Sequence, residues 1–561
     1  METNAEAIEA VEALFESYRP EYKGYRACID DEGRPTGGHA WLFTIRSDDL
    51  AITTDQAFPY SRPQAYIVGY DVRRGLPHVE SSGRLCLTKI EMSSIGMESA
   101  RQVLAEALEL LEAHETGAEE EDLREDFTTY WNQREFGGGP ALALLYQEGA
   151  TTGACVSTVD EVFAFGNKRS MMRWWENRTG HGPRFCNAAH FINLRSFPHP
   201  SSFPTDGPSL ITFLDKFTHD GSSRVFAALS SFPRASLFIL VGQTPLGRTQ
   251  FAGLRLVKRE PLRKDGFRHK KRVKLNLEGK IARHQLMASY GLQRLRTSRL
   301  DSASTRATID IGKLIHKKVI LVGCGALGSG IARMLAKAGI GKLTLVDGEL
   351  LGWENIRRHE LGGTRIRLPK AEAIAETIKA DLPELQFAVA YNNTIQDVVL
   401  SGAKLLEGAD MIIACTGSLH ADTFIDEISR AGGTRIPVVF GWMEAWGVAA
   451  HGVLLTRDSS SILDGFEDGS PRFPAARNEN LPPKECGNTA TPFGATELAA
   501  AQAMITELCL EVLLDPAIAD TWRTWWTSDR NLERVGGNWT DEFQALKPVS
   551  CQSGVLERRW P

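Results

Sequence analysis

The second half of the chain alternates short apolar runs with stretches in which apolar residues recur at helical spacing. Runs long enough for buried strands lie at 317–323, 342–348, 409–417 and 436–442. Stretches with apolar residues on one helical face lie at 329–339 and 369–381. Strands that alternate with helices in this way predict a doubly wound α/β domain with a parallel sheet.

The beginning of the chain has a different pattern. Apolar positions at helical spacing cover 7–15 and again 97–114. Three strand-like runs between these helices lie at 24–29, 40–45 and 65–70. A turn-rich stretch at 75–87 follows the strands, and a charged helix from about residue 119 to 131 leads onward. The order of helix, strands, loop and helix predicts a separate α+β domain.

The middle of the chain has fewer recognisable patterns. Strand-like runs occur at 236–242 and 251–257, among many Gly, Pro and Ser residues, and no catalytic motif stands out there. We therefore predict three domains, which follow these changes of pattern. They cover residues 1–145, residues 146–305 as a linker domain, and residues 306–561.

Composition narrows the class of protein. A chain of 561 residues is too long for a single core, and a net charge of -6 gives no general attraction to nucleic acid. The nine cysteines stand singly, without a CxxC pair, which argues against a structural zinc site and for a reducing compartment. The N-terminus lacks the apolar core of a signal peptide, and no apolar run reaches the roughly 18 residues of a membrane helix. We expect a soluble, cytoplasmic protein.

A glycine-rich turn follows the first predicted strand of the α/β domain. Gly323, Gly325 and Gly328 form a G-x-G-x-x-G pattern where the strand passes into a helix. Glycines let a phosphate approach the backbone, and a helix N-terminus offers N–H groups and a positive dipole end. Asp347 ends the next strand, 19 residues after Gly328, where a carboxylate binds ribose hydroxyls. These features suit NAD or FAD as well as ATP.

A polar segment after the second strand favours ATP over a dinucleotide. Asn355, Arg357 and Arg358 lie in this segment, and Lys370 opens the following helix. Clustered cations neutralise a triphosphate during displacement, whereas a nicotinamide ring needs apolar contacts. The alternative is that these residues are surface charges on a loop.

The stretch 323–361 resembles the adenylation domain shared by ThiF, MoeB and the ubiquitin-activating enzymes. The resemblance implies a Rossmann-like fold in which the glycines of the turn hold ATP and Asp347 binds its ribose. It also implies phosphate contacts from Asn355, Arg358 and Lys370. Arg358 and Lys370 would thus act in catalysis, because they stabilise the charge that develops when a carboxylate attacks ATP.

One position departs from that family's pattern. Members usually have an aspartate that helps to hold Mg²⁺ in a C-T-D-N motif, and this chain has Gly417 in its place. Glycine has no side chain to bind a metal, so the magnesium ligands stay unassigned. Asp347, Asp410 and Asp422 are the carboxylates considered for this role.

Cys486 lies in a loop just before a helical stretch at 495–514. A thiol near a helix N-terminus has a lowered pKa, and Lys484 would add to this effect. In ubiquitin-activating enzymes a loop cysteine after the adenylation core takes the acyl group as a thioester, and by resemblance this role falls to Cys486. Three other cysteines are interpreted as structural, namely Cys324, Cys415 and Cys509.

Two segments of the first domain resemble a ubiquitin-conjugating enzyme. These are Phe-Pro-Tyr-Ser-Arg-Pro at 58–63 and the stretch 76–87, which contains Cys86. The resemblance implies that Cys86 accepts the acyl group as a second thioester. His78 stands where that family has an asparagine that steadies the oxyanion. A histidine can donate to the oxyanion or take the proton of the attacking amine.

The two resemblances together are more specific than either alone. A conjugating-like domain ahead of an activating-like domain is similar to the bacterial fusion enzymes of CBASS antiphage operons. This resemblance implies ATP- and Mg²⁺-dependent activation of the C-terminal carboxylate of a cGAS-like nucleotidyltransferase. The acyl group would pass from Cys486 to Cys86 and then to a lysine of a target protein. A homodimer is implied as well, with Arg296 or Arg299 reaching the ATP of the other subunit.

Four other interpretations stay open. An activating–conjugating enzyme for a bacterial ubiquitin-like modifier would have the same sequence features, because the acyl donor is a different protein. A sulfur-carrier adenylyltransferase would have no use for a conjugating domain. An NAD-dependent oxidoreductase rests on the glycine turn and Asp347 alone, and a non-enzymatic scaffold is supported by Gly417. The sequence leaves open the acyl donor, the acceptor, the oligomeric state and the role of the linker domain.

Overall fold

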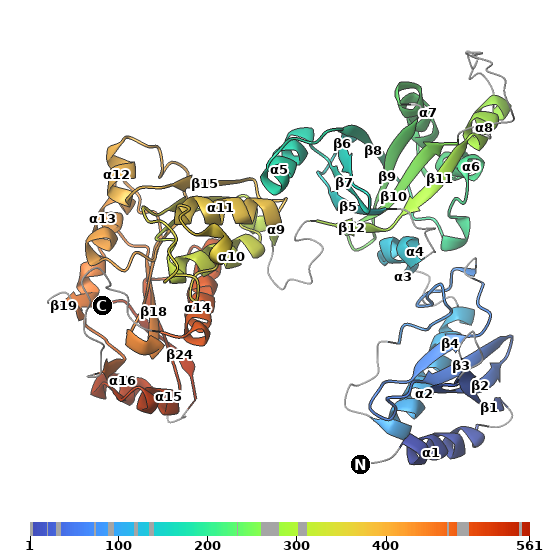
Figure 1. Ribbon diagram of the computed structural model, residues 1–561, viewed down its shortest axis with the longest axis horizontal. Coiled ribbons are helices and arrows are strands. Elements are labelled where there is room, and N and C mark those ends of the chain that lie inside the picture. The colour runs from blue at the N-terminus through green and yellow to red at the C-terminus, as the bar shows by residue number, and fades with distance from the viewer. Residues whose placement is uncertain are drawn as a thin grey trace. The chain divides into compact units, whose positions relative to one another are not determined.

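The computed structural model divides the chain into two compact units (Figure 1). One unit combines residues 1–168 with 185–298, and the other combines 169–184 with 299–561. The structure describes residues 4–18, 21–29, 35–71, 74–87, 95–116, 122–133, 140–232, 234–259, 280–300, 311–467, 470–478, 493–548 and 552–561. No helix among them has the length and apolar character that crossing a membrane requires.

The first unit begins with a helix and four antiparallel strands, in the order β1-β2-β3-β4. These elements are α1 (Asn4–Glu16), β1 (Tyr22–Ile29), β2 (Pro35–Ile45), β3 (Asp48–Thr54) and β4 (Gln64–Ile67). Helix α2 (Gly96–Thr116) packs beside α1, and both contribute to a core around Trp41 and Phe43. The sequence pattern missed β3, because Leu50, Ala51 and Ile52 are buried in succession instead of alternating.

Two short helices follow where one charged helix was predicted. They are α3 (Asp122–Glu125) and α4 (Phe127–Gln133). Helix α4 packs into the core of the middle sheet, where Trp131 is fully buried. The Trp131 indole N–H donates to the carbonyl oxygens of Gly253 (3.2 Å) and Leu295 (3.3 Å). Helix α4 is therefore anchored to the middle sheet, although it follows the N-terminal domain in sequence.

The middle of the chain, where the pattern predicted two strands, forms an eight-stranded sheet in the order β11-β10-β9-β8-β6-β7-β5-β12. The strands are β5 (Ala141–Leu145), β6 (Thr152–Ser157), β7 (Glu161–Phe165), β8 (Asn187–Asn193), β9 (Ala235–Gln243), β10 (Thr249–Lys258), β11 (Tyr290–Leu295) and β12 (Thr297–Arg299). The helices of this stretch are α5 (Lys168–Thr179), α6 (Gly207–Phe217), α7 (Gly221–Ser231) and α8 (Lys280–Ala288). Several of these strands are short and bury consecutive residues, so they lack the alternation that identifies a strand.

The second unit contains another eight-stranded sheet, in the order β15-β14-β13-β16-β17-β18-β22-β24. The strands are β13 (Lys318–Val322), β14 (Lys342–Val346), β15 (Phe387–Tyr391), β16 (Met411–Ala414), β17 (Val438–Met443), β18 (Ala449–Leu455), β22 (Thr521–Trp526) and β24 (Gly554–Arg559). The first five are parallel; four of them follow the predicted runs, and β15 was not predicted. The last three pair antiparallel, which departs from the predicted parallel sheet. The connection between β17 and β18 is too short for the crossover that a parallel pair needs.

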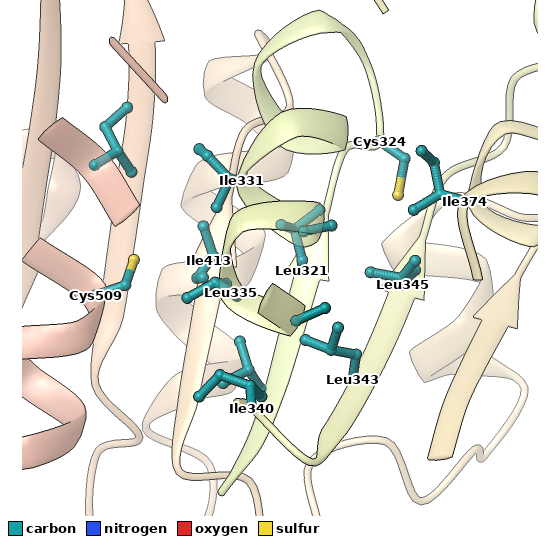
Figure 2. Packing of buried hydrophobic residues seen from close by; sticks show 14 of the residues in the cluster. Leu321, Cys324, Ile331, Leu335, Ile340, Leu343, Leu345, Ile374, Ile413 and Cys509 are labelled. Carbon is teal, nitrogen blue, oxygen red and sulfur yellow. The ribbon is translucent and has the colours of Figure 1, made fainter. Parts of the chain in front are cut away.

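Helices cover this sheet and complete its core. They are α9 (Ile311–Leu314), α10 (Ala326–Lys337), α11 (Lys370–Asp381), α12 (Ile395–Leu400), α13 (Leu419–Ser429), α14 (Ala495–Leu514), α15 (Asp529–Arg534) and α16 (Asp541–Leu546). Two small ribbons pair β19 (Phe466–Glu467) with β20 (Ser470–Pro471) and β21 (Ala476–Asn478) with β23 (Gly537–Trp539). Cys324 and Cys509 are fully buried in the core of this unit (Figure 2), in agreement with their interpretation as structural cysteines.

Candidate functional site

The three glycines of the turn after β13 have three different structural roles. Gly323 has a positive φ of 89°, and a Cβ there would lie 2.4 Å from the Cys415 carbonyl oxygen. A Cβ on Gly328 would lie 1.9 Å from the carbonyl oxygen of Gly323, so glycine lets α10 pack directly onto the turn. Gly325 caps the N-terminus of α10, and a Cβ there would meet no atom within 4 Å. The open approach to the helix N-terminus, where an anion is favoured, therefore lies at Gly325.

Asp347 holds this turn in place from the end of β14. One carboxylate oxygen accepts a hydrogen bond from the Cys324 N–H at 2.7 Å, and the other accepts from the Glu349 N–H at 2.7 Å. Burial raises the pKa of Asp347, and these two N–H groups oppose the shift. Each carboxylate oxygen has a second lone pair, so Asp347 can still accept from a ribose hydroxyl. The predicted ribose ligand thus also shapes the glycine turn.

His359 ties the polar segment to the same turn. Its Nδ1 accepts a hydrogen bond from the Leu361 N–H at 3.1 Å, so the proton is on Nε2, which donates to the Cys324 carbonyl oxygen at 2.8 Å. Burial lowers the pKa of His359, which favours this neutral form. His359 therefore adds no cation to the site, although it lies directly after Arg358.

The predicted phosphate ligands lie at the carboxyl edge of the sheet, near the turn. Asn355 closes its own loop, since its side-chain oxygen accepts from the Gly352 N–H at 2.9 Å. The Arg358 guanidinium lies over the ring of Phe493, 4.9 Å from the ring centre. Lys370 begins α11 with only 6% of its side chain exposed, and its ammonium lies 2.5 Å from the carboxylate of the exposed Glu349.

The three carboxylates considered for a metal lie in different places. Asp410 precedes β16 at the opposite edge of the sheet, where it accepts from the Lys317 ammonium and the Lys318 N–H, so it is excluded as a ligand at the turn. Asp422, on α13, accepts from the Thr416 hydroxyl at 2.7 Å, and burial raises its pKa to about 7. No group of three or more His, Cys, Asp or Glu side chains arranged for a metal occurs within the described ranges.

The candidate arginines for an intersubunit contact lie beside the middle sheet. Arg299 ends the edge strand β12, and Arg296 immediately precedes that strand. The Arg296 carbonyl oxygen accepts a hydrogen bond from the Leu142 N–H at 2.7 Å, next to β5. A contact with the ATP of another subunit stays a prediction for both residues.

Cys86 lies on a tight loop beside β4. Its N–H donates to the His78 carbonyl oxygen at 2.7 Å, and the Leu85 N–H donates to the Ala65 carbonyl oxygen at 2.8 Å. The thiol is half-buried and opens into a surface depression of about 280 Å³. This depression is lined by Arg62, Pro63, Gln64, Ala65, Arg84, Leu85, Cys86 and Leu87. The thiol is therefore within reach of another molecule.

A carboxylate lies against this thiol. Cys86 Sγ donates to Oε1 of Glu80 at 3.7 Å, and the same oxygen lies 2.8 Å from the Arg84 guanidinium. Burial and the negative charge of Glu80 raise the pKa of Cys86, while Arg84 opposes the shift. This arrangement favours the neutral thiol of Cys86 over the thiolate.

His78 has a left-handed backbone conformation, with a φ of 54°. Asparagine and histidine both tolerate this conformation better than most residues, which explains how His78 can replace an asparagine here. Its N–H donates to the Tyr130 hydroxyl at 2.8 Å, and its ring Nε2 lies 3.1 Å from Oδ2 of Asp122. The loop is thus held by side chains from α3 and α4.

Sequence reasoning missed Glu80, Asp122 and Tyr130. Glu80 lies between His78 and Cys86 in the motif, and this position could have identified it as a candidate. Asp122 and Tyr130 belong to no motif, and only the fold brings them to the loop. Cys486 and Lys484 lie outside the described residues; the described chain resumes at Phe493, the residue that packs on Arg358.

Comparison with known proteins assigns a family to each end of the chain. Residues 304–508 match the ThiF family, and residues 45–136 match the prokaryotic E2 family B. A protein from Pseudomonas aeruginosa named "ATP-dependent ubiquitin transferase-like protein Cap2" is 31% identical over 182 residues, which cover 31% of this chain and 32% of that protein. A protein of the same name from Escherichia coli is 25% identical over 260 residues, which cover 42% of this chain and 40% of that protein.

The solved structures with a similar fold are more distant. The crystal structure of E. coli MccB has a TM-score of 0.32 at 14% identity, over 41% of this chain and 63% of that chain. The chain matches less than half the length of either Cap2 relative. The two family matches nevertheless confirm the two predicted resemblances and the predicted fold class, and the domain boundaries stay a prediction. The chain thus combines a region that matches the prokaryotic E2 family B with a region that matches the ThiF family.

Proposed function

We propose that this chain uses ATP to activate the C-terminal carboxylate of one protein and ligates it, through thioesters, to an amine of a second protein. One observation carries the proposal. A ThiF-type turn that is open at Gly325 occurs in the same chain as a reachable thiol, Cys86, on an E2-like loop. The turn can bind the ATP that activates a carboxylate, and the Cys86 thiol can carry the resulting acyl group as a thioester.

The first step joins two anions. A carboxylate oxygen attacks the α-phosphorus of ATP, and the bond to pyrophosphate breaks. Arg358 and Lys370 lower the repulsion between the anions and stabilise the charge of the transition state. Lys370 is already buried and fixed by Glu349, so a phosphate that replaces this carboxylate would meet an oriented ammonium.

The described residues fit a nucleotide with a magnesium ion. The N–H groups at the start of α10 and the empty space at Gly325 suit phosphate, and Asp347 suits the ribose. Mg²⁺ would neutralise phosphate charge in this site. Of the carboxylates considered, Asp347 and Asp422 could each contribute a metal ligand through the lone pairs that their hydrogen bonds leave open.

The later steps move the acyl group between sulfur atoms. The Cys486 thiolate attacks the acyl-adenylate, and AMP leaves. The Cys86 sulfur then takes the acyl group from Cys486, and an amine attacks the carbonyl carbon of the new thioester. The carbon–nitrogen bond forms as the carbon–sulfur bond breaks, and the amine loses a proton. His78 lies on the Cys86 loop, where its role at the developing oxyanion stays a prediction.

We propose that the acyl donor is a cGAS-like nucleotidyltransferase of a CBASS antiphage system, and that the acceptor is a lysine of a cytoplasmic protein. The order of the two domains and the similarity to proteins named Cap2 support this choice. A homodimer through the ThiF-type domain is part of the proposal. A ubiquitin-like protein as donor would use the same chemistry.

Mass spectrometry of the full chain tests the proposal. The chain is incubated with ATP, Mg²⁺ and, separately, a purified nucleotidyltransferase or ubiquitin-like protein encoded beside its gene. A thiol-reducible adduct is expected on Cys486 and on Cys86. Cys86→Ala is expected to keep the Cys486 adduct and to abolish ligation, whereas the matched variant Cys186→Ala keeps both. Undiminished ligation by Cys86→Ala contradicts the proposal.

A further inference from the structure

Glu80 is placed to take part in the chemistry at Cys86. Its carboxylate lies 3.7 Å from the Cys86 sulfur and is about one-third exposed. Two contacts fix it, because Arg84 binds the carboxylate at 2.8 Å and the Glu80 N–H donates to the Arg84 carbonyl oxygen at 2.8 Å. The carboxylate is therefore oriented toward the sulfur and remains open to solvent on another side.

The ring of His78 is engaged elsewhere. Its Nε2 lies 3.1 Å from the carboxylate of Asp122, and its backbone is held by Tyr130 on one side and Cys86 on the other. The Nε2 atom of His78 is therefore occupied by Asp122. Glu80, in contrast, touches the reacting sulfur directly.

We propose that Glu80 accepts the proton of the amine that attacks the Cys86 thioester, an inference that rests on the proposed function. When the thioester forms, the sulfur loses its hydrogen, so the carboxylate loses the donor that it binds at rest. An incoming amine then supplies the replacement N–H. As the carbon–nitrogen bond forms and the carbon–sulfur bond breaks, the amine proton passes to Glu80 and the sulfur leaves with the electron pair.

The charges of the site favour this route. A carboxylate ion beside the sulfur opposes the formation of a thiolate, which is the leaving group of the reaction. Protonation of Glu80 removes that repulsion as the thiolate forms. The proton then passes from Glu80 to the sulfur, which regenerates the thiol and the carboxylate. Atoms and charges balance without another reactant.

A discharge assay on the full chain tests this role without ATP or Cys486. Cys86 is acylated by exchange with the benzyl thioester of N-acetylglycine, and loss of the acyl group to free lysine is followed by mass spectrometry of the Cys86 peptide. Glu80→Gln is expected to slow discharge to lysine by about 100-fold, a usual scale for a proton-transfer group. Glu80→Asp retains part of the rate, and Glu16→Gln, on the exposed face of α1, leaves it unchanged.

Hydroxylamine distinguishes proton transfer from a structural defect. Its nitrogen is much less basic than an alkyl amine, so the proton that it carries after attack passes readily to water, and the rates for Glu80→Gln and wild type are expected to agree within about threefold. Alkylation of Cys86 by iodoacetamide gives a second readout. Loss of the neighbouring charge shifts its pH profile to lower pH in Glu80→Gln.

Each outcome decides one question. Discharge of Glu80→Gln to lysine within twofold of wild type overturns the role of Glu80, and so does an equal defect with lysine and hydroxylamine. If wild-type Cys86 thioester reacts with lysine no faster than the benzyl thioester in solution, the proposed function fails at its last step, and the inference fails with it.

Discussion

The turn at Gly323 is shaped mainly by close main-chain contacts, whereas the loop at Cys86 also depends on side chains from other helices. In the turn, glycines permit close contacts between main-chain atoms, and Asp347 accepts from two backbone N–H groups. In the loop, Tyr130 and Asp122 reach in from other helices, and Glu80 contacts the thiol. Main-chain contacts fix the spacing of the glycines in the turn, so the turn can be recognised in the sequence. The surroundings of the Cys86 loop depend on the tertiary fold.

This difference also separates the two kinds of chemistry. The proposed nucleotide site presents N–H groups and cations that would not change during the reaction, which suits stabilisation of phosphate charge. The thiol site must bind and release protons, and its carboxylate and imidazole can do so. We therefore expect substitutions at the turn to affect adenylation alone and substitutions around the loop to affect ligation alone.

Arg358→Ala gives the largest effect that this comparison predicts. Loss of a cation that stabilises the transition state lowers the rate of ATP–pyrophosphate exchange by roughly two to three orders of magnitude. Lys370→Ala is expected to behave alike, and discharge of a preformed Cys86 thioester stays unchanged in both variants. Arg357→Ala is the control, because Arg357 is exposed and lies next to Arg358 in the sequence. An effect of Arg358→Ala below about threefold refutes its assigned role.

The same difference explains what the sequence could predict. Gly323, Gly325 and Gly328 have a spacing that backbone geometry imposes, so the turn and the strand before it were predicted from the pattern alone. The Cys86 loop was found only through its resemblance to a family. Its supports, Asp122 and Tyr130, lie 44 and 52 residues after His78 and share no spacing with the motif.

The fold, too, could be predicted from the sequence only in part. Four of the five parallel strands of the second unit were predicted from their alternation with helices, and the pattern missed the fifth, β15. In the middle sheet, β5 and β7 bury three or four residues in succession, which no periodic pattern distinguishes from a buried helix. Asp410 was a plausible metal ligand by composition, but its position before β16 rather than after it places it at the wrong edge of the sheet.

A pair of alanine substitutions separates the glycines that shape the turn from the one that faces a ligand. Gly328→Ala places a Cβ 1.9 Å from a backbone oxygen, so it is expected to lower the free energy of unfolding of the second unit by about 3 kcal/mol. The Cβ that Gly325→Ala adds has no atom within 4 Å, so the melting temperature of this variant is expected to equal that of the wild type. Calorimetry measures both effects.

Gly325→Ala is nevertheless expected to weaken ATP binding by about tenfold, or about 1.4 kcal/mol, because the added methyl group occupies the approach to the α10 N-terminus. Isothermal titration with ATP and Mg²⁺ measures this loss. Unchanged affinity in a well-folded Gly325→Ala protein would place the phosphates elsewhere. The two variants therefore test stability and binding independently.

Tyr130→Phe gives the smallest of the predicted effects and tests the loop at its most distant support. The substitution removes the hydroxyl that accepts from the His78 N–H and leaves the aromatic ring, which is buried in the core of the middle sheet. A single hydrogen bond contributes about 1 kcal/mol, so discharge of the Cys86 thioester to lysine is expected to slow by about fivefold. Tyr146→Phe, in the core around β5 and β7, is the matched control. ATP–pyrophosphate exchange stays at the wild-type rate, because the contacts described for the turn at Gly323 do not involve Tyr130. A parallel loss of exchange in Tyr130→Phe would show that the two sites are coupled.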